Sequence, residues 1–205
     1  MSTDRSSAAL DALPPGPFLG RRVELARLCR AVEQTRDGRG GRLWIVGPQG
    51  IGKSRLLAEI AQYGALRNVP VERASSNMDP DAYPIGPGLV IVDPVANAHV
   101  TVLDDRLRRA SERGILGLAT ATSFGQGLPA GIPETAVIAV EGLDSNDSFR
   151  LLRAWLGPAI ELAWARRIIQ STHGHPGQMR LAAERLLTTN RGGGLRGRAA
   201  PTSDA

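Results

Sequence analysis

Lysine is almost absent from this sequence of 205 residues: of its 25 lysine and arginine residues, all but one are arginines. Cysteine occurs once, so no disulfide can form within the chain, and we expect Cys29 to serve as core packing. No stretch approaches the roughly 20 apolar residues that cross a bilayer, and residues 1–17 lack the apolar centre of a signal peptide. These absences argue against a disulfide-stabilised secreted domain and a membrane protein, and they predict a cytoplasmic one.

The single lysine lies in a phosphate-binding loop with the pattern G-x-x-x-x-G-K-S, formed by Gly47, Pro48, Gln49, Gly50, Ile51, Gly52, Lys53 and Ser54. A compact ammonium fits between the β- and γ-phosphates of a nucleotide, whereas a planar guanidinium is too wide for that position. The glycines let backbone N–H groups face the phosphates, Lys53 neutralises their charge and the Ser54 hydroxyl ligates Mg²⁺. We therefore predict that this loop and the adjacent Arg55 bind a magnesium-nucleotide, with Lys53 also acting in catalysis.

Around this loop, short apolar strands alternate with amphipathic helices. We predict helices at 22–32, directly after the loop, and around 102–110, with strands at 43–46, 69–74, 88–92, 115–119 and 136–140. This alternation predicts an α/β fold, the three-layer sandwich of a P-loop NTPase with a mainly parallel five-stranded sheet. From residue 145 onwards the pattern is helical, with helices expected at 145–156, 160–172 and 178–188, which indicates a small all-helical lid.

Composition divides the chain into four expected parts: a flexible N-terminal tail at 1–16, a nucleotide-binding core at 17–142, a helical lid at 143–190 and a flexible basic tail at 191–205. The connections 78–87 and 124–135 are rich in proline and glycine, so we do not expect regular helices there. Because such connections normally help to cover a sheet, we expect part of an apolar sheet face to be bare. A protein partner or a second copy of the chain could cover it.

A second acid is expected on the metal side of the site. Asp93 directly follows the apolar strand 88–92 and is placed to help hold Mg²⁺. The next residue is Pro94 rather than an acid that polarises water, and residues 124–135 contain no arginine finger. The sequence therefore predicts nucleotide binding. It leaves open whether this candidate ATPase hydrolyses ATP to ADP and phosphate.

Residues 18–25 have the pattern F-x-G-R-x-x-E-L just before the first strand and the loop. With these features the chain resembles STAND and related AAA-type signal-transduction ATPases over most of residues 18–188. The resemblance implies ATP as the nucleotide, and no guanine-reading motif of the N/TKxD type occurs. It also implies roles near the adenine for Leu19, Gly20 and Arg21, a γ-phosphate sensor at Thr120 or Thr122, of which Thr122 is our candidate, and a base contact from Pro176 in the turn Gly174-His175-Pro176.

These features predict a nucleotide-dependent switch or regulatory subunit. Relatives of this type fuse the module to sensor repeats and an effector domain, neither of which is found in these 205 residues, so we expect it to act on a partner in trans. Arg180 is placed where it could reach a γ-phosphate from the lid, although a solvated helix arginine is the simpler interpretation. Trp155 and Trp164 are expected in the lid core.

Three other functions are weighed against this one. The formal net charge of +5 suggests an ATP-dependent DNA-associated protein, but the arginines are scattered among acids, which does not favour nucleic-acid binding. The second alternative is a true ATPase whose general base comes from elsewhere in the fold or from a partner. A small-molecule kinase is the third, and the sequence shows no acceptor pocket for it.

Overall fold

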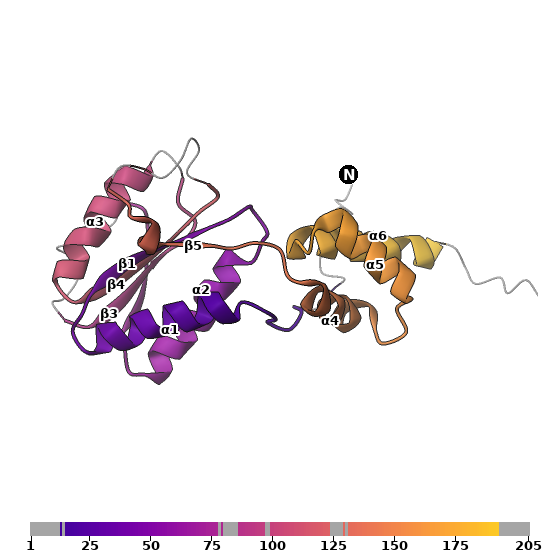
Figure 1. Ribbon diagram of the computed structural model, residues 1–205, viewed down its shortest axis with the longest axis horizontal. Coiled ribbons are helices and arrows are strands. Elements are labelled where there is room, and N and C mark those ends of the chain that lie inside the picture. The colour runs from indigo at the N-terminus through magenta and orange to yellow at the C-terminus, as the bar shows by residue number, and fades with distance from the viewer. Residues whose placement is uncertain are drawn as a thin grey trace, which may run out of the picture.

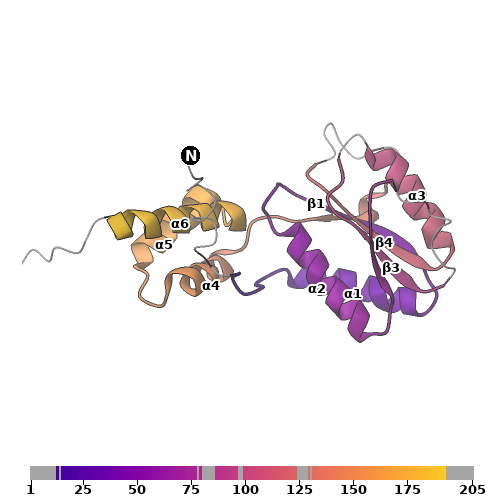
Figure 2. The ribbon, with the colours of Figure 1, turned by 180° about the vertical axis from the view of Figure 1, so that it is seen from behind.

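The computed structural model has two lobes, a core built around a β-sheet and a lid of helices (Figures 1 and 2). It describes residues 13, 15–77, 79, 86–96, 99–123, 129 and 131–192, with side chains up to residue 188. Much of the two proline- and glycine-rich connections, and most of the expected C-terminal tail, lie outside the described residues.

Five strands form one parallel sheet in the order β2-β3-β4-β1-β5. They are β1 (Gly41–Val46), β2 (Val71–Ala74), β3 (Gly88–Val92), β4 (Ile115–Ala121) and β5 (Val137–Ala139), the last preceded by a short 3₁₀ helix, η3 (Glu134–Ala136). Each overlaps a predicted strand, and the predicted parallel five-stranded sheet is confirmed. Because the strands are parallel, their carboxyl ends meet at one edge of the sheet.

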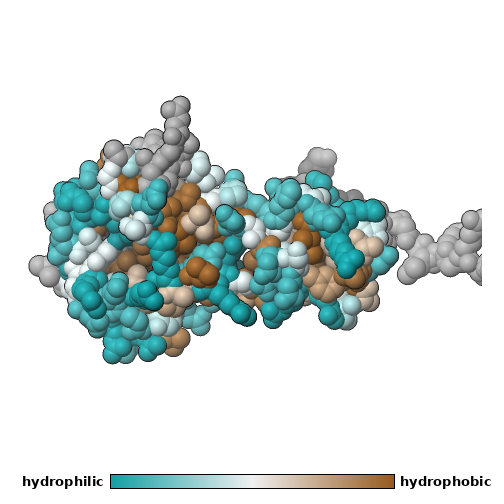
Figure 3. Space-filling view, viewed as in Figure 1, coloured by the Kyte–Doolittle hydropathy of each residue, from teal (hydrophilic) through white to brown (hydrophobic). Residues whose placement is uncertain are grey.

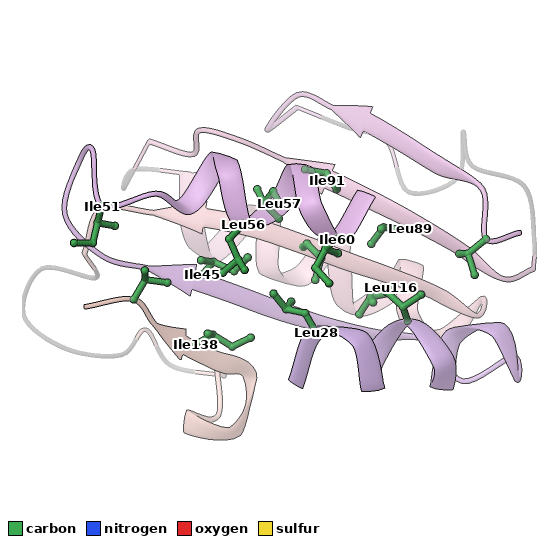
Figure 4. Packing of buried hydrophobic residues seen from close by; sticks show 14 residues of the cluster. Leu28, Ile45, Ile51, Leu56, Leu57, Ile60, Leu89, Ile91, Leu116 and Ile138 are labelled. Carbon is green, nitrogen blue, oxygen red and sulfur yellow. The ribbon is translucent and has the colours of Figure 1, made fainter. Parts of the chain in front are cut away.

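Helices cover both faces of this sheet. On one face, α1 (Arg22–Arg36) and α2 (Lys53–Leu66) bring Leu28, Leu56 and Ile60 against Ile45 and its neighbours (Figure 4). On the other face, α3 (Val100–Glu112) packs against the side chains that point the opposite way, Trp44 among them. The adjacent residues Trp44 and Ile45 are thus both fully buried in different layers, which explains the continuous apolar run of β1.

The expectation of a bare sheet face is not met by the described residues. On the α3 face, Trp44, Val90 and Val92 are at most 3% exposed. The reason is that Val95, from the connection after β3, and a short segment before β5 pack into the same cluster as α3. Partly buried members remain at Val46, Ala74 and Val137.

A buried polar cluster ties α3 to the sheet. The Asp104 carboxylate is 6% exposed and accepts hydrogen bonds from Trp44 Nε1 at 2.8 Å and from Arg42 Nε at 2.9 Å, both through Oδ1. Arg42 also donates to the Gly131 carbonyl at 2.9 Å. A charged group in the core is therefore paired and hydrogen-bonded, as burial of a carboxylate requires.

The lid consists of α4 (Ser145–Leu156), α5 (Leu162–Thr172) and α6 (Pro176–Gly192). Helix α4 has the bounds predicted from the sequence, because Asp144 caps its start by accepting a hydrogen bond from the Asp147 N–H at 2.7 Å. The three helices enclose a separate apolar cluster around Leu152, Met179 and Ala183. Trp164, expected in the lid core, is 45% exposed.

The chain before α1 is attached to the lid as well as to the core. Leu13 falls in the expected flexible tail, yet its side chain is 3% exposed within the lid cluster and its carbonyl accepts a hydrogen bond from Arg180 Nη2 at 3.0 Å. Further along, Phe18 packs on the core cluster and Leu19 on the lid cluster. The polar composition of residues 1–16 hid this anchor, since a single leucine supplies it.

Among the described residues, no helix is both long and apolar enough to span a membrane. Figure 3 shows hydrophilic residues over most of the visible face, with hydrophobic residues gathered in the middle of the core lobe and on the lid.

Candidate functional site

The residues singled out in the sequence meet at the carboxyl edge of the sheet. Pairing of β1 with β4 aligns Val46 with Ala121, and pairing of β3 with β4 aligns Val92 with Ala119, so the residues after these strands are neighbours. They surround a cleft of about 620 Å³, the phosphate cleft, lined by Gln49, Gly50, Gly52, Lys53, Ser54, Arg55, Asp93, Pro94, Val95, Thr120, Ala121 and Thr122. This volume lies within the roughly 300–1,000 Å³ of small-molecule sites.

The phosphate-binding loop is shaped by two glycines and ends at a helix start. Gly50 and Gly52 have φ of 81° and 107°, in the left-handed region that glycine adopts without strain. Helix α2 begins at Lys53, directly after this curl. The first N–H groups of a helix have no partner within it, and together with the helix dipole they favour an anion at this place.

The Lys53 side chain lies within the loop. Its ammonium donates hydrogen bonds to the Gly47 carbonyl at 2.6 Å and to the Pro48 carbonyl at 3.0 Å. Burial lowers the pKa of Lys53, and the nearby Asp93 carboxylate acts in the opposite direction. A desolvated cation held beside a cleft is typical of functional sites.

Asp93 and Thr120 form a pair at the ends of β3 and β4. The Thr120 hydroxyl is fully buried and donates to Asp93 Oδ1. Thr122, our candidate sensor, is exposed at the rim of the same cleft. The structure thus gives the two hydroxyls different surroundings, with Thr120 orienting the carboxylate and Thr122 open to a ligand.

A second, mostly apolar pocket adjoins the phosphate cleft and shares Gly52 and Arg55 with it. This apolar pocket has a volume of about 90 Å³ and is lined by Pro17, Phe18, Leu19, Arg21, Ile51, Gly52, Arg55, Leu143, Leu151, Trp155 and Pro176. Its walls come from three parts of the chain: the opening segment (residues 15–21), the phosphate-binding loop and the lid. The predicted base-contacting residues Leu19, Arg21 and Pro176 therefore lie together.

Arg21 has a structural partner in this arrangement. Its guanidinium donates to the Ile51 carbonyl at 3.1 Å and pairs with Glu24 at 3.4 Å, with the Arg21 side chain 7% exposed. The opening segment is thereby fastened to the phosphate-binding loop. Gly20 lies beside Leu143 and Asp147 rather than among the described residues that line either cavity.

The lid touches the tip of the phosphate-binding loop. The Gly177 N–H, in the first turn of α6, donates to the Gly50 carbonyl at 3.1 Å. The approach is so close that a Cβ on Gly177 would stand 3.0 Å from that oxygen and 3.2 Å from Gly50 Cα. The sequence analysis did not identify Gly177. The only signal in the sequence was its position directly after the Gly174-His175-Pro176 turn.

The oxygen groups in the cleft suit a magnesium ion shared with phosphates. Ser54 and Asp93 both line the cleft, and hydroxyl and carboxylate oxygens are ligands that Mg²⁺ prefers. Within the described part of the chain, no group of three or more His, Cys, Asp and Glu side chains could hold a metal ion by itself. Mg²⁺ commonly takes one or two protein ligands and completes its shell with phosphate and water.

The charged groups among the described residues of the cleft are Lys53, Arg55 and Asp93. Among its described lining residues, Asp93 is the one carboxylate and Pro94 follows it. Arg180 does not line the cleft; it pairs with Glu184 at 2.9 Å and donates to the Leu13 carbonyl. Residues 124–128 and 130, which belong to the connection without arginine, lie outside the described residues.

The fold and the loop define a P-loop NTPase with a helical lid. A family model described as "AAA ATPase domain" matches residues 17–160. The chain therefore belongs to the AAA ATPase domain family. No curated protein matches it.

Solved structures share this fold at low sequence identity. Domain III of the replication initiation protein DnaA from Thermotoga maritima superimposes with a TM-score of 0.59 and 15% identity, over 92% of this chain and 93% of that one. A structure of Drosophila ORC bound to DNA superimposes with a TM-score of 0.64 and 12% identity, over 94% of this chain and 63% of that one. A replication initiator DnaA bound to AMPPCP and single-stranded DNA superimposes with a TM-score of 0.53 and 16% identity, over 86% of this chain and 66% of that one. At such identities the likeness describes the fold alone.

Proposed function

We propose that this AAA ATPase domain binds ATP and Mg²⁺ between its core and its lid and acts as a nucleotide-dependent switch for a protein partner. One observation carries the proposal: the phosphate cleft and the apolar pocket adjoin at Gly52 and Arg55, and the lid contacts the loop between them through Gly177 and Gly50. A ligand that fills both cavities touches core and lid at once. Its binding energy can therefore differ between lid positions, as a switch requires.

The residues have distinct proposed roles. The loop amides and Lys53 bind the phosphates, Ser54 and Asp93 hold Mg²⁺, and Thr122 reads the γ-phosphate. The opening segment and Pro176 enclose the base. When bound, the metal neutralises charge on the phosphates.

Hydrolysis is proposed to be weak or to depend on a partner. A positioned general base contributes roughly 10²–10⁴ in rate, and the described cleft offers no carboxylate besides Asp93, which Thr120 already engages. A slow reaction would let the ATP-bound state persist long enough to be read by a partner. Any self-association or partner binding would have to use a surface other than the largely buried α3 face of the sheet.

Calorimetric titration with MgATP tests the binding step. Lys53→Ala should weaken affinity by about 100-fold, the order expected for losing charge-assisted hydrogen bonds to phosphate. Arg109→Ala is the matched control, because it removes a cation from the exposed face of α3 and should bind normally. Equal affinity of the two variants would contradict the proposed phosphate site.

Hydrogen exchange tests the switch. A nearly complete change of lid position requires about 5.5 kcal/mol of differential binding. Amides of the lid turn (residues 173–177) and the start of α6 should exchange at different rates with ATP, with ADP and without nucleotide. Identical protection in the three states would rule out a nucleotide-driven lid.

DNA association is the second candidate function. Two of the solved structures that share this fold have DNA bound, and residues 143–192 contain seven arginines against four acidic residues. A steep salt dependence of DNA binding, with more affinity in MgATP, would support it. Binding that is absent or insensitive to salt would reject it.

A further inference from the structure

Trp155 is the one described residue with a buried polar side-chain atom that lacks a hydrogen-bond partner. Its indole Nε1 is inaccessible to solvent and has no acceptor within reach. Indole N–H groups usually find a partner when buried, and an unsatisfied buried donor destabilises the folded state. The two other tryptophans differ: Trp44 donates to Asp104, and Trp164 is 45% exposed.

The position of this N–H connects it to the apolar pocket. Trp155 lies in the last turn of α4, on the lid side of the pocket, and lines the pocket together with Leu151. Nε1 faces the backbone of the opening segment, because a Cβ on Gly16 would stand 2.7 Å from Nε1 and 2.6 Å from Leu151 Cδ1. Only a residue without a side chain can cover the indole edge so closely.

The pocket must widen before it can hold a purine. Its volume of about 90 Å³ is below the roughly 300–1,000 Å³ that is usual for ligand pockets. Gly16, which covers Nε1, precedes the lining residue Pro17 and does not itself line the pocket, so the N–H becomes available only where widening also moves the backbone at Gly16 away from the indole edge. The N–H is then uncovered at the wall of the pocket.

We propose that Trp155 is a specificity-determining residue that reads the nucleobase, with its indole Nε1–H donating a hydrogen bond to an unprotonated ring nitrogen of the purine. This inference rests on the proposed function, since it assigns a base contact within the same nucleotide site. The other walls of the pocket are mostly apolar, so they supply contact area but little means of telling one base from another. The two arginines at its border lie on the side of the phosphate-binding loop.

Trp155→Phe is the direct test, because it keeps an aromatic ring and removes the N–H. Affinity for ATP in calorimetry should fall roughly 3- to 10-fold, the range for one neutral hydrogen bond. Affinity for inorganic tripolyphosphate should not change. The melting temperature without ligand should not fall, because the variant also removes a buried unsatisfied donor. Trp164→Phe is the matched control and should leave all three quantities unchanged.

A second measurement leaves the protein unaltered. Among 1-deaza-, 3-deaza- and 7-deaza-ATP, each lacking one ring nitrogen, one analogue should bind the wild-type chain about as weakly as ATP binds Trp155→Phe. That analogue and ATP should bind the variant equally, which is the signature of a shared contact in a double-mutant cycle.

The outcomes are separable. Unchanged ATP affinity in Trp155→Phe, equal binding of all three deaza analogues by the wild type, or parallel loss of ATP and tripolyphosphate binding with a lower melting temperature overturns this inference alone. Failure of wild-type protein to bind ATP overturns the proposed function and this inference with it.

Discussion

Lys53 combines a phosphate-binding position with an electrostatic cost. Its ammonium is held by the Gly47 and Pro48 carbonyls, and burial lowers its pKa. The protonated side chain is therefore less favourable in the folded protein than in the unfolded chain. A phosphate group would compensate this cost, whereas the fold alone does not.

The pH dependence of stability should reveal this cost. Because the folded-state pKa of Lys53 is lowered, the unfolded chain binds more protons between the lowered value and the ordinary lysine value, and the free energy of unfolding rises with pH across that window. Urea denaturation of Lys53→Met should lack this rise and show a stability at neutral pH no lower than that of the wild type. A variant that unfolds at much lower urea would show that Lys53 stabilises the fold instead.

The two threonines at the end of β4 offer a matched pair. Thr120→Val removes the hydroxyl that donates to Asp93 from a fully buried site and should lower the free energy of unfolding by about 1 kcal/mol. Thr122→Val, at the exposed rim of the cleft, should change stability by less than about 0.5 kcal/mol and narrow the difference in affinity between ATP and ADP. Equal destabilisation by both, measured by urea unfolding, would contradict their different surroundings.

At the scale of elements, the contact between α3 and the sheet depends on Asp104. Asp104→Ala leaves Arg42 Nε and the buried Trp44 N–H without their acceptor, and we expect a loss of about 3–5 kcal/mol in chemical denaturation. Asp105→Ala, on the exposed side of the same helix, should cost less than about 0.5 kcal/mol. Similar losses in the two variants would exclude a special role for the buried cluster.

The elements were predictable where local signals agreed with packing. The apolar strands and the capped helix α4 were found from the sequence, because burial on two faces and an Asp144 cap leave clear patterns. The ends of α1 and β4 were not predicted from the sequence. Helix α1 continues past residue 32 to Arg36, because Thr35 is fully buried and its hydroxyl donates a hydrogen bond to the Ala31 carbonyl. β4 continues to Ala121 because its polar-looking end is paired with Val46.

The candidate site shows the same division. The loop residues and Asp93 follow from a motif and from a strand end, so their gathering at one edge of the sheet was predictable. The contact of Gly177 with Gly50 and the position of Trp155 beside Gly16 were not, because they join segments far apart in the chain through backbone proximity. A glycine and an aromatic residue carry no sequence signal for such contacts.

At the scale of the whole molecule, core and lid are joined by the opening segment and by the lid contact at the loop. Leu13 and Leu19 pack on the lid, Phe18 packs on the core, and the Gly177 N–H reaches the Gly50 carbonyl. The lid is thus linked to the rest of the chain at two places. Movement of the lid should change both links together.

Gly177→Ala tests this coupling. The new Cβ would meet the Gly50 backbone at 3.0–3.2 Å, which a side-chain movement cannot relieve, so the lid turn should separate from the loop. We expect faster hydrogen exchange at the start of α6 and little change in the sheet. Gln178→Ala is the control, since it alters the next, exposed residue and keeps every backbone contact. Unchanged exchange in Gly177→Ala would mean that this contact does not hold the lid.

The composition of the chain has a practical consequence for chemical labelling. Since Lys53 is the one lysine in the sequence, an amine-directed acylating reagent has a single ε-amine to modify, and the lowered pKa leaves a larger fraction of that amine unprotonated, and therefore reactive, near neutral pH. Every other side-chain cation is a guanidinium and would be inert to the reagent. The extent of acylation at this one position, measured by mass spectrometry, would report directly what fraction of the molecules has its phosphate-binding loop occupied.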